Sequence, residues 1–374
     1  MMIDIIEVNS RKLLRDFIYL PSYIHANHAN WVPPIYMDEW DYFNPKKNDS
    51  FSHCDTIMLL AYNDNRPVGR IMGIIQRSYN QQHNEKHARF AYLETENNQI
   101  IHNALMDAVI AWAQHKGMTH IVGPLGFSDK DPQGFMIEGF DAPVTIATNC
   151  NQPYMVDLVG NYGFVPKLDL VVYKVPVPET KPEIITRIEE RFRNRKTDLR
   201  VMEFRARRQV RPYIRPVLSL VNQTFTDIYG FIPFTTREMD EMANRYLYLI
   251  NPEYIKIIVN GKNEVIAFVL GMSDLSEGFR KSRGKLFPFG FIHLLRAGKK
   301  STQLNLLLGA VHPDYQGRGL DMLMGARLIE SARKNGKKVM DSHLELESNL
   351  KVRAEMERMG GKVYKRFRIF IKEL

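Results

Sequence analysis

The two halves of this 374-residue chain repeat one succession of apolar and polar patterns. Early in each half, at 56–76 and at 254–271, two apolar runs flank a short polar turn, which predicts a β-hairpin. Segments 100–116 and 320–335 place apolar side chains at helical spacing, and a glycine closely follows each. Each half is therefore predicted to contain a hairpin, a helix and further strands in the same order.

The spacing of these elements indicates a tandem duplication. The final predicted strands, 170–174 and 367–372, each end 118 positions after the start of their hairpin, from 56 to 174 and from 254 to 372. Such a repeat indicates two copies of one unit, and two unrelated segments of similar length are the alternative. We predict a mixed α/β (α+β) fold with two units, each a mostly antiparallel twisted sheet flanked by helices.

A proline-rich segment separates the two units. Pro176, Pro178 and Pro182 fall within seven residues, which disfavours both helix and central strand and is typical of a linker. We expect a first domain over 1–175, a linker with a helix over 176–198, and a second domain over 199–374.

Charge divides unequally between the halves. The formal net charge is +9, but residues 1–177 hold 14 basic and 19 acidic side chains, which leaves 37 basic and 23 acidic in the remainder. An anionic partner is therefore expected at the second half. Cys54 and Cys150 are the only cysteines, which excludes a disulfide scaffold and a multi-cysteine zinc site, so no metal site is predicted. Residues 1–20 lack the apolar core of a signal peptide, and we expect a cytoplasmic protein.

A strand-to-helix turn in the second half has the composition of a phosphate-binding loop. The apolar run 304–311 leads to Gly317 and Gly319, and the helical pattern begins at Leu320. Glycines allow close approach of backbone N–H groups, and a helix N-terminus adds unpaired donors and a positive dipole end. No Walker loop is present, and a dinucleotide fingerprint is incomplete because Met322 replaces its third glycine. A turn without a ligand is the alternative.

The segment from Val311 to Leu320 resembles the acyl-CoA-binding motif Q/R-x-x-G-x-G/A of the GNAT N-acyltransferase superfamily, with Asp321 as a departure at the last position. The whole chain resembles a family of two-domain bacterial GNAT-like acyltransferases. The resemblance implies acetyl-CoA or a longer acyl-CoA as co-substrate, with its pyrophosphate on the loop and its pantetheine arm along the preceding strand. The cofactor-binding residues so implied are Ala310, Val311, Gln316, Gly317, Arg318, Gly319, Leu320 and Asn349. Segment 97–100, at the equivalent place in the first half, has no glycine, so one acyl-CoA site is expected.

Candidates for a catalytic base lie on residues 339–346. On a strand, Asp341, His343 and Glu345 share one face by alternation. His343, or a Glu345 whose pKa is raised by burial, is predicted to take the proton of the amine, and a solvated polar edge is the alternative. Many GNAT enzymes place a tyrosine acid seven residues after the residue that Asn349 matches, but Met356 stands there and cannot donate a proton.

Two insertions distinguish the halves. Residues 123–143 form a long turn-rich segment that is predicted to cover the substrate pocket, with Glu138, Asn149 and Tyr154 facing the amine. A surface loop without function is the alternative. Residues 280–300 hold seven Lys or Arg and no acid around an aromatic run. This pattern suits an anionic membrane surface or an entry for an acyl chain, and a buried helix with basic ends is the alternative.

These observations together predict an acyl-CoA-dependent N-acyltransferase that moves an acetyl or longer acyl group to an amine, either a small molecule or a lipid-like amine. The alternative, motivated by Met356, is a non-catalytic acyl-CoA-binding sensor or scaffold. Peripheral contact with the inner membrane face is expected through 280–300. Nucleic acid is not expected as a partner, because no recognised nucleic-acid motif is present.

Overall fold

The computed structural model describes residues 3–145, 148–181, 183–194 and 197–374. Both predicted hairpins and both predicted long helices are present, with ends shifted by at most two residues. The strands of the first half are β1 (Asp4–Glu7), β2 (Cys54–Asn63), β3 (Arg66–Gln76), β4 (His87–Thr95), β5 (His120–Gly123), β6 (Phe135–Glu138) and β7 (Val165–Pro176). Its helices are α1 (Arg11–Ile24), α2 (Tyr36–Tyr42), α3 (Ser50–His53), α4 (Arg77–His83), α5 (Gln99–His115) and α6 (Tyr154–Asn161).

The second half repeats this succession after a connecting helix, α7 (Glu183–Asn194). Its strands are β8 (Arg200–Glu203), β9 (Ile255–Val259), β10 (Val265–Ser273), β11 (Gln303–Val311), β12 (Val339–Asp341), β13 (Glu345–Leu346) and β14 (Lys362–Glu373). Its α-helices are α8 (Arg207–Val210), α9 (Ile214–Thr224), α10 (Thr236–Tyr246), α11 (Ser276–Ser282), α12 (Gly290–Lys300), α13 (Leu320–Lys334) and α14 (Leu350–Arg358). Three 3₁₀ turns complete the described part: η1 (Arg211–Tyr213), η2 (Pro252–Tyr254) and η3 (Pro313–Tyr315).

The described strands join into one 14-stranded sheet in the order β1-β2-β3-β4-β5-β14-β7-β12-β11-β10-β9-β8, with β6 beside β14 and β13 beside β7. Neighbouring strands are antiparallel except for two pairs, β4 with β5 and β11 with β12. These parallel pairs occupy equivalent places in the two halves. The mostly antiparallel, duplicated architecture predicted from the sequence is confirmed.

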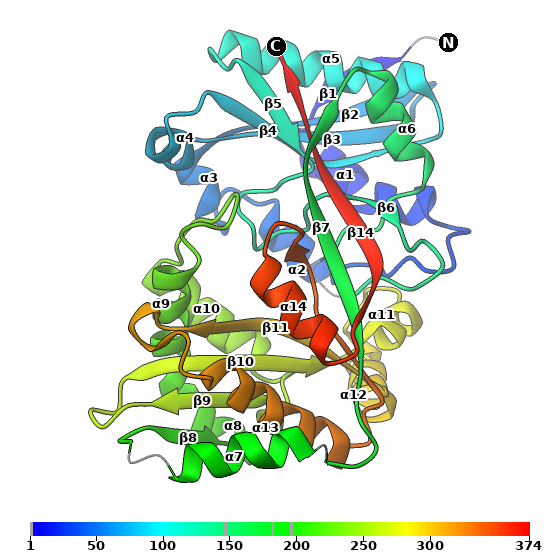
Figure 1. Cartoon of the computed structure of the whole chain (residues 1–374). Coiled ribbons are helices and arrows are strands. Elements are labelled where there is room, and N and C mark those ends of the chain that lie inside the picture. Colours follow the sequence, from blue (N-terminus) through cyan, green and yellow to red (C-terminus); the bar gives the residue numbers. More distant parts are fainter. Residues whose placement is uncertain (1–2, 146–147, 182, 195–196) are drawn as a thin grey trace.

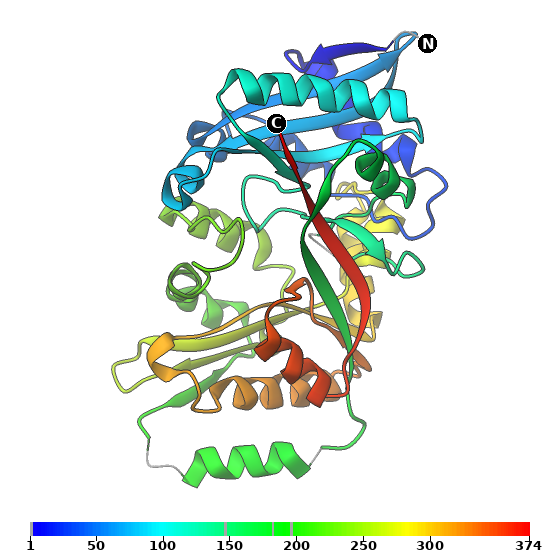
Figure 2. The same cartoon turned by 45° about the horizontal axis from the view of Figure 1, so that its top comes forward.

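The two halves exchange their last strands. β7 ends the first half, yet residues 174–176 pair with β12 of the second half. β14 ends the chain, yet residues 370–373 pair with β5 of the first half. The two strands also pair with each other from Val165 to Lys174, and they run through the middle of the molecule between the two halves (Figures 1 and 2). The division of the chain at residues 175 and 199 stays a proposal.

Alternating side chains of β9, in the part of the sheet formed by the second half, pack into two different cores. Ile255, Ile257 and Val259 of β9 pack with α9 and α10, whereas Ile258 packs with Leu323 of α13 on the opposite face. This two-residue alternation is what a strand covered by helices on both faces requires. It holds α13 against the sheet with its N-terminus at the end of β11.

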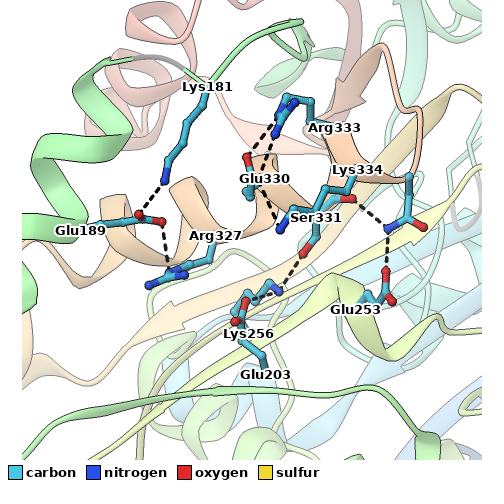
Figure 3. A network of polar contacts seen from close by, with 11 residues as sticks. Lys181, Glu189, Glu203, Glu253, Lys256, Arg327, Glu330, Ser331, Arg333 and Lys334 are labelled. Carbon is cyan, nitrogen blue, oxygen red and sulfur yellow. Dashed lines mark hydrogen bonds and ion pairs between the residues drawn. The ribbon is translucent and has the colours of Figure 1, made fainter.

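A polar network fixes the rest of α13 to its neighbours (Figure 3). The buried Lys256 ammonium of β9 lies 2.6 Å from a Glu203 carboxylate oxygen and donates to the Ser331 hydroxyl at 2.8 Å. On the other side, Glu189 of α7 lies 3.4 Å from Arg327. Because its buried charge has a partner, Lys256 avoids the large cost of an isolated buried ammonium. α13 is therefore a rigid support for the loop that precedes it.

The strand exchange predicts which half loses stability when a residue of β14 is substituted. Phe370 of β14 is 4% exposed and belongs to the core of the first half. Phe370→Ala should cost about 3–5 kcal/mol of unfolding free energy, and hydrogen exchange should accelerate in β5 and α5 more than in β9 and β10. Exposed Phe287→Ala is the control. Faster exchange confined to the second half would contradict the exchanged arrangement.

Candidate functional site

The loop between β11 and α13 has an open backbone geometry. Gly317 and Gly319 have φ angles of 70° and 77°, in the left-handed region that glycine adopts without strain. A Cβ added at either position meets no atom within 4 Å, so both face open space. Gly319 is the N-cap of α13, and no side chain among the described residues caps this helix. The first N–H groups of α13, from Leu320 on, are therefore available to an anion.

Two side chains predicted to bind a cofactor hold this loop in shape. Gln316 Nε2 donates to the carbonyl of Val311 at 3.3 Å. The Arg318 guanidinium donates to the carbonyl of Asp314 at 2.8 Å and lies 4.8 Å from the ring centroid of Tyr315. Both contacts tie the glycine turn to the segment that leaves β11.

The strands β11 and β12 diverge beside this loop. They pair only from Gln303 to Asn305 on β11. Beyond Asn305, β11 is paired with β10 alone among the described strands, and a bulge leaves Leu307 without an opposite residue. Ala310 and Val311, predicted to pair with a pantetheine arm, lie on this one-sided stretch. An extended ligand could add to its open edge as a further strand.

Buried polar side chains meet where the two strands part. Asn305 and Asp341 are register partners, and both are 0% exposed. Asp341 accepts hydrogen bonds from the Tyr364 hydroxyl and from the His343 N–H, the latter at 2.9 Å. Asn305 Oδ1 accepts from Gln303 at 2.8 Å, but Asn305 Nδ2 is buried with no hydrogen-bond partner in the described part of the chain. Such a donor is costly and suits an acceptor atom of a ligand.

Asn305 and Tyr364 were not singled out in the sequence. Asn305 interrupts an apolar strand, which is the one local signal that could have marked it. Tyr364 comes from the end of the chain through the strand exchange, and no local pattern links it to Asp341. Burial and the neighbouring Asp341 charge raise the pKa of the Tyr364 hydroxyl.

The strand predicted over 339–346 is interrupted. β12 ends at Asp341, His343 has a φ of 59°, and pairing resumes as β13 at Glu345. The single face predicted for Asp341, His343 and Glu345 is therefore wrong. At this interruption side chains replace ladder bonds, because the Asp341 carboxylate accepts the His343 N–H and the Ser342 hydroxyl accepts the Tyr173 N–H of β7, both at 2.9 Å.

Glu345 lies in a group of carboxyls at the start of α13. Burial and the nearby charge of Glu355 raise the pKa of Glu345 to about 8. Burial and a hydrogen bond with Asp321 raise the pKa of Glu355 to about 7. A carboxyl that titrates near neutral pH has the basicity of a proton acceptor at that pH. The catalytic roles of His343 and Glu345 remain predictions.

Asn349 and Met356 both lie on α14. Asn349 is its N-cap, and Asn349 Oδ1 accepts from the Val352 N–H at 3.4 Å. Met356 is buried in the core between α13 and the exchanged strands. The position at which many GNAT enzymes place a tyrosine acid is thus filled by a packing residue here. Tyr364 is on β14 rather than α14, and its hydroxyl donates to the Asp341 carboxylate.

The first-half insertion reaches the divergence of β11 and β12. The Lys365 ammonium, next to Tyr364, donates to the carbonyl of Pro143. Burial lowers the pKa of Lys365 to about 8, against the opposing effect of Asp341. The Ser276 hydroxyl of α11 donates to the carbonyl of Val144 at 3.0 Å. The segment at 143–144 therefore packs against the exchanged strand and against α11.

The three predicted acceptor residues are not brought together by their contacts. Glu138 is mostly exposed and lies 3.5 Å from Arg366. Asn149 Nδ2 donates to the carbonyl of Gly134 at 2.6 Å, which folds the insertion on itself. The Tyr154 hydroxyl donates to the carbonyl of Thr95 at 2.7 Å. Their proposed role toward an amine is untested.

The equivalent loop of the first half is built differently. Asn98 caps α5 with its own side chain, which accepts the Ile100 N–H at 2.8 Å and so uses a donor that an anion would need. Glu94 of β4 binds His25 at 2.8 Å, and His25 contacts His28 at 3.0 Å. A row of contacting polar side chains, Glu94, His25 and His28, therefore lies near the end of β4. The start of α5 is already capped by a side chain.

Two kinds of feature are absent from the described residues. No group of three or more His, Cys, Asp or Glu is placed there to hold a metal ion. None of the helices that the structure describes is both long and apolar enough to cross a membrane.

Known proteins resemble this chain over nearly its whole length. The chain is 27% identical over 382 residues to the bacterial ceramide synthase of Caulobacter vibrioides, covering 100% of this chain and 98% of the relative. It is 24% identical to protein YghO of Escherichia coli, covering 96% and 93%. No family model matches the chain.

The fold is shared with a tandem GNAT protein from the clavulanic acid biosynthesis pathway. The TM-score is 0.58 at 11% identity, with 100% of this chain and 98% of that structure covered. The chain thus has a tandem GNAT fold, as its resemblance to GNAT proteins predicted.

The glycine loop yields a matched pair of substitutions. If the loop binds coenzyme A as the sequence predicts, Gly319→Val should reduce that binding at least about tenfold, because a β-branched residue is strained at this φ and covers the N–H donors. Gly325→Ala in α13 also enters open space but at a helical position, and should leave binding unchanged. Isothermal titration with coenzyme A measures both. Equal affinities for the two variants would refute the anion-binding loop.

Proposed function

We propose that this chain is an acyl-CoA-dependent N-acyltransferase that moves an acetyl or longer acyl group to an amine. The observation that carries the proposal is the joint presence of the uncapped glycine loop and the one-sided edge of β11. The first suits a diphosphate and the second suits an extended amide-containing arm. The name of the Caulobacter relative supports acyl transfer to an amine, since ceramide formation acylates one.

Acyl-CoA supplies the acyl group, and coenzyme A leaves as the free thiol. A C–N bond to the amine forms as the C–S bond breaks, the amine proton passes to a base, and the sulfur receives a proton. In this proposal Glu345 is the base, because its pKa of about 8 allows proton uptake near neutrality. The Leu307 N–H, at the bulge of β11, is a candidate donor to the developing oxyanion.

A non-catalytic acyl-CoA-binding protein is the second candidate. Met356 favours it, since this buried side chain cannot protonate a leaving thiolate. A thiolate is a good leaving group, however, and can leave without a proton from the protein.

The assay that separates the two candidates follows free thiol. Acetyl-CoA and palmitoyl-CoA are each incubated with the full chain and a panel of small and long-chain amines, and the amide is identified by mass spectrometry. We expect amine-dependent thiol release, at least about tenfold lower in Gly319→Val than in Gly325→Ala. Binding of acyl-CoA without thiol release for any amine would favour the sensor.

The pKa of Glu345 predicts a pH profile. A base acts in its ionised form, and Glu345 is protonated below its pKa of about 8. The rate at saturating substrates should therefore rise with pH up to about 8 and then level off. Glu345→Gln should lower the rate by about 10²–10⁴-fold and remove this rise. Coenzyme A affinity serves as the control, and an unchanged profile in Glu345→Gln would exclude the residue as base.

A further inference from the structure

The α11–α12 hairpin carries an exposed aromatic tip. Phe287 and Phe289, in the turn between the helices, are 73% and 68% exposed, and Phe291 and Leu295 of α12 are 45% and 46% exposed. Large apolar side chains are usually covered, so four of them within nine residues indicate a surface with a partner. Figure 1 shows the two helices together at one side of the molecule.

The same hairpin has a second, covered face. Phe279, Leu286 and Leu294 are buried there with Val32 of the first half and Leu307 of β11 packed against them. The Tyr36 N–H donates to the carbonyl of Gly284 at 3.1 Å, which attaches the turn to the first half. The inner face thus attaches the hairpin to the rest of the molecule. The exposed aromatic residues do not belong to that buried cluster.

Cations flank the aromatic tip on both sides along the sequence. Every lysine and arginine from 280 to 300 is exposed: Arg280, Lys281, Arg283, Lys285, Arg296, Lys299 and Lys300. The segment contains no acid, and the nearest acid in its own helix, Glu277, is paired with Lys281. Apolar side chains that insert, together with exposed cations on the same hairpin that attract phosphate headgroups, are complementary to an anionic bilayer.

We propose that the α11–α12 hairpin is a docking surface for an anionic lipid bilayer. Phe287, Phe289, Phe291 and Leu295 insert among the acyl chains, and the exposed cations of the hairpin contact lipid phosphates. The inner face of the hairpin packs on Leu307, beside the divergence of β11 and β12. Docking therefore brings the candidate reaction centre close to the membrane, where a long-chain amine would be held. This surface goes beyond the proposed function, and its test requires no catalysis.

Co-sedimentation with vesicles tests the proposal. The full chain should bind phosphatidylcholine vesicles that contain about one third phosphatidylglycerol, and should bind pure phosphatidylcholine more weakly. Added salt should weaken the binding. The double variant Phe287→Ser/Phe289→Ser should lose at least about tenfold in affinity. Lys299→Glu/Lys300→Glu should lose affinity for anionic vesicles only.

Matched variants control for nonspecific effects. Ile100→Ser alters an exposed apolar residue of α5, and Lys116→Glu alters the exposed basic residue that follows this helix. Both lie in the first half, and both variants should bind vesicles like the unmodified chain. Coenzyme A affinity should be the same in all variants, so a failed vesicle result is separable from a failed acyl-CoA site. Absent binding, or equal binding by the phenylalanine variant, overturns the proposal. So does a variant that loses palmitoyl-CoA affinity but keeps vesicle binding, because the tip would then receive an acyl chain.

Discussion

The antiparallel pairing of β7 with β14 is the interaction on which the candidate site depends. β7 continues into the second half by pairing with β12, and β14 continues into the first by pairing with β5. Neither half can separate without losing an internal strand of its sheet. The same pairing carries Tyr364 and Lys365 to Asp341, and it brings Pro143 of the first half against them. One unit alone could not bring these four residues together.

Local features of the fold could be predicted because their causes are local. The hairpins and long helices follow from the period of apolar residues over a few turns. The glycine loop could be predicted because the left-handed φ at 317 and 319 favours glycine, which adopts it without strain. The strand exchange has no such signal. Segments 170–174 and 367–372 both have strand patterns. These patterns do not say in which half of the sheet each strand lies.

The error at residues 339–346 has a physical reason as well. Asp341, His343 and Glu345 alternate with less polar residues, as in a strand with one wet face. Periodicity does not register that an aspartate can replace a ladder partner by binding a backbone N–H two residues on. Nor does it register that Tyr364, distant in sequence, would supply the second hydrogen bond. A polar residue at the end of a short parallel strand, such as Asp341, therefore gives little support for predicting that the strand continues beyond it.

The distribution of charge gains a different meaning once it is placed on the fold. The loop from 312 to 321 contains Arg318 but also Asp314 and Asp321, so side-chain charge there does not favour an anion. Recognition of a diphosphate at this loop would rest on backbone N–H donors and the start of α13, which act at short range. Seven of the 37 basic residues of the second half instead gather, without an acid, on segment 280–300. Long-range attraction to an extended anionic surface requires that kind of accumulation, whereas binding of one diphosphate does not. The basic excess is thus better explained by the hairpin than by the cofactor loop.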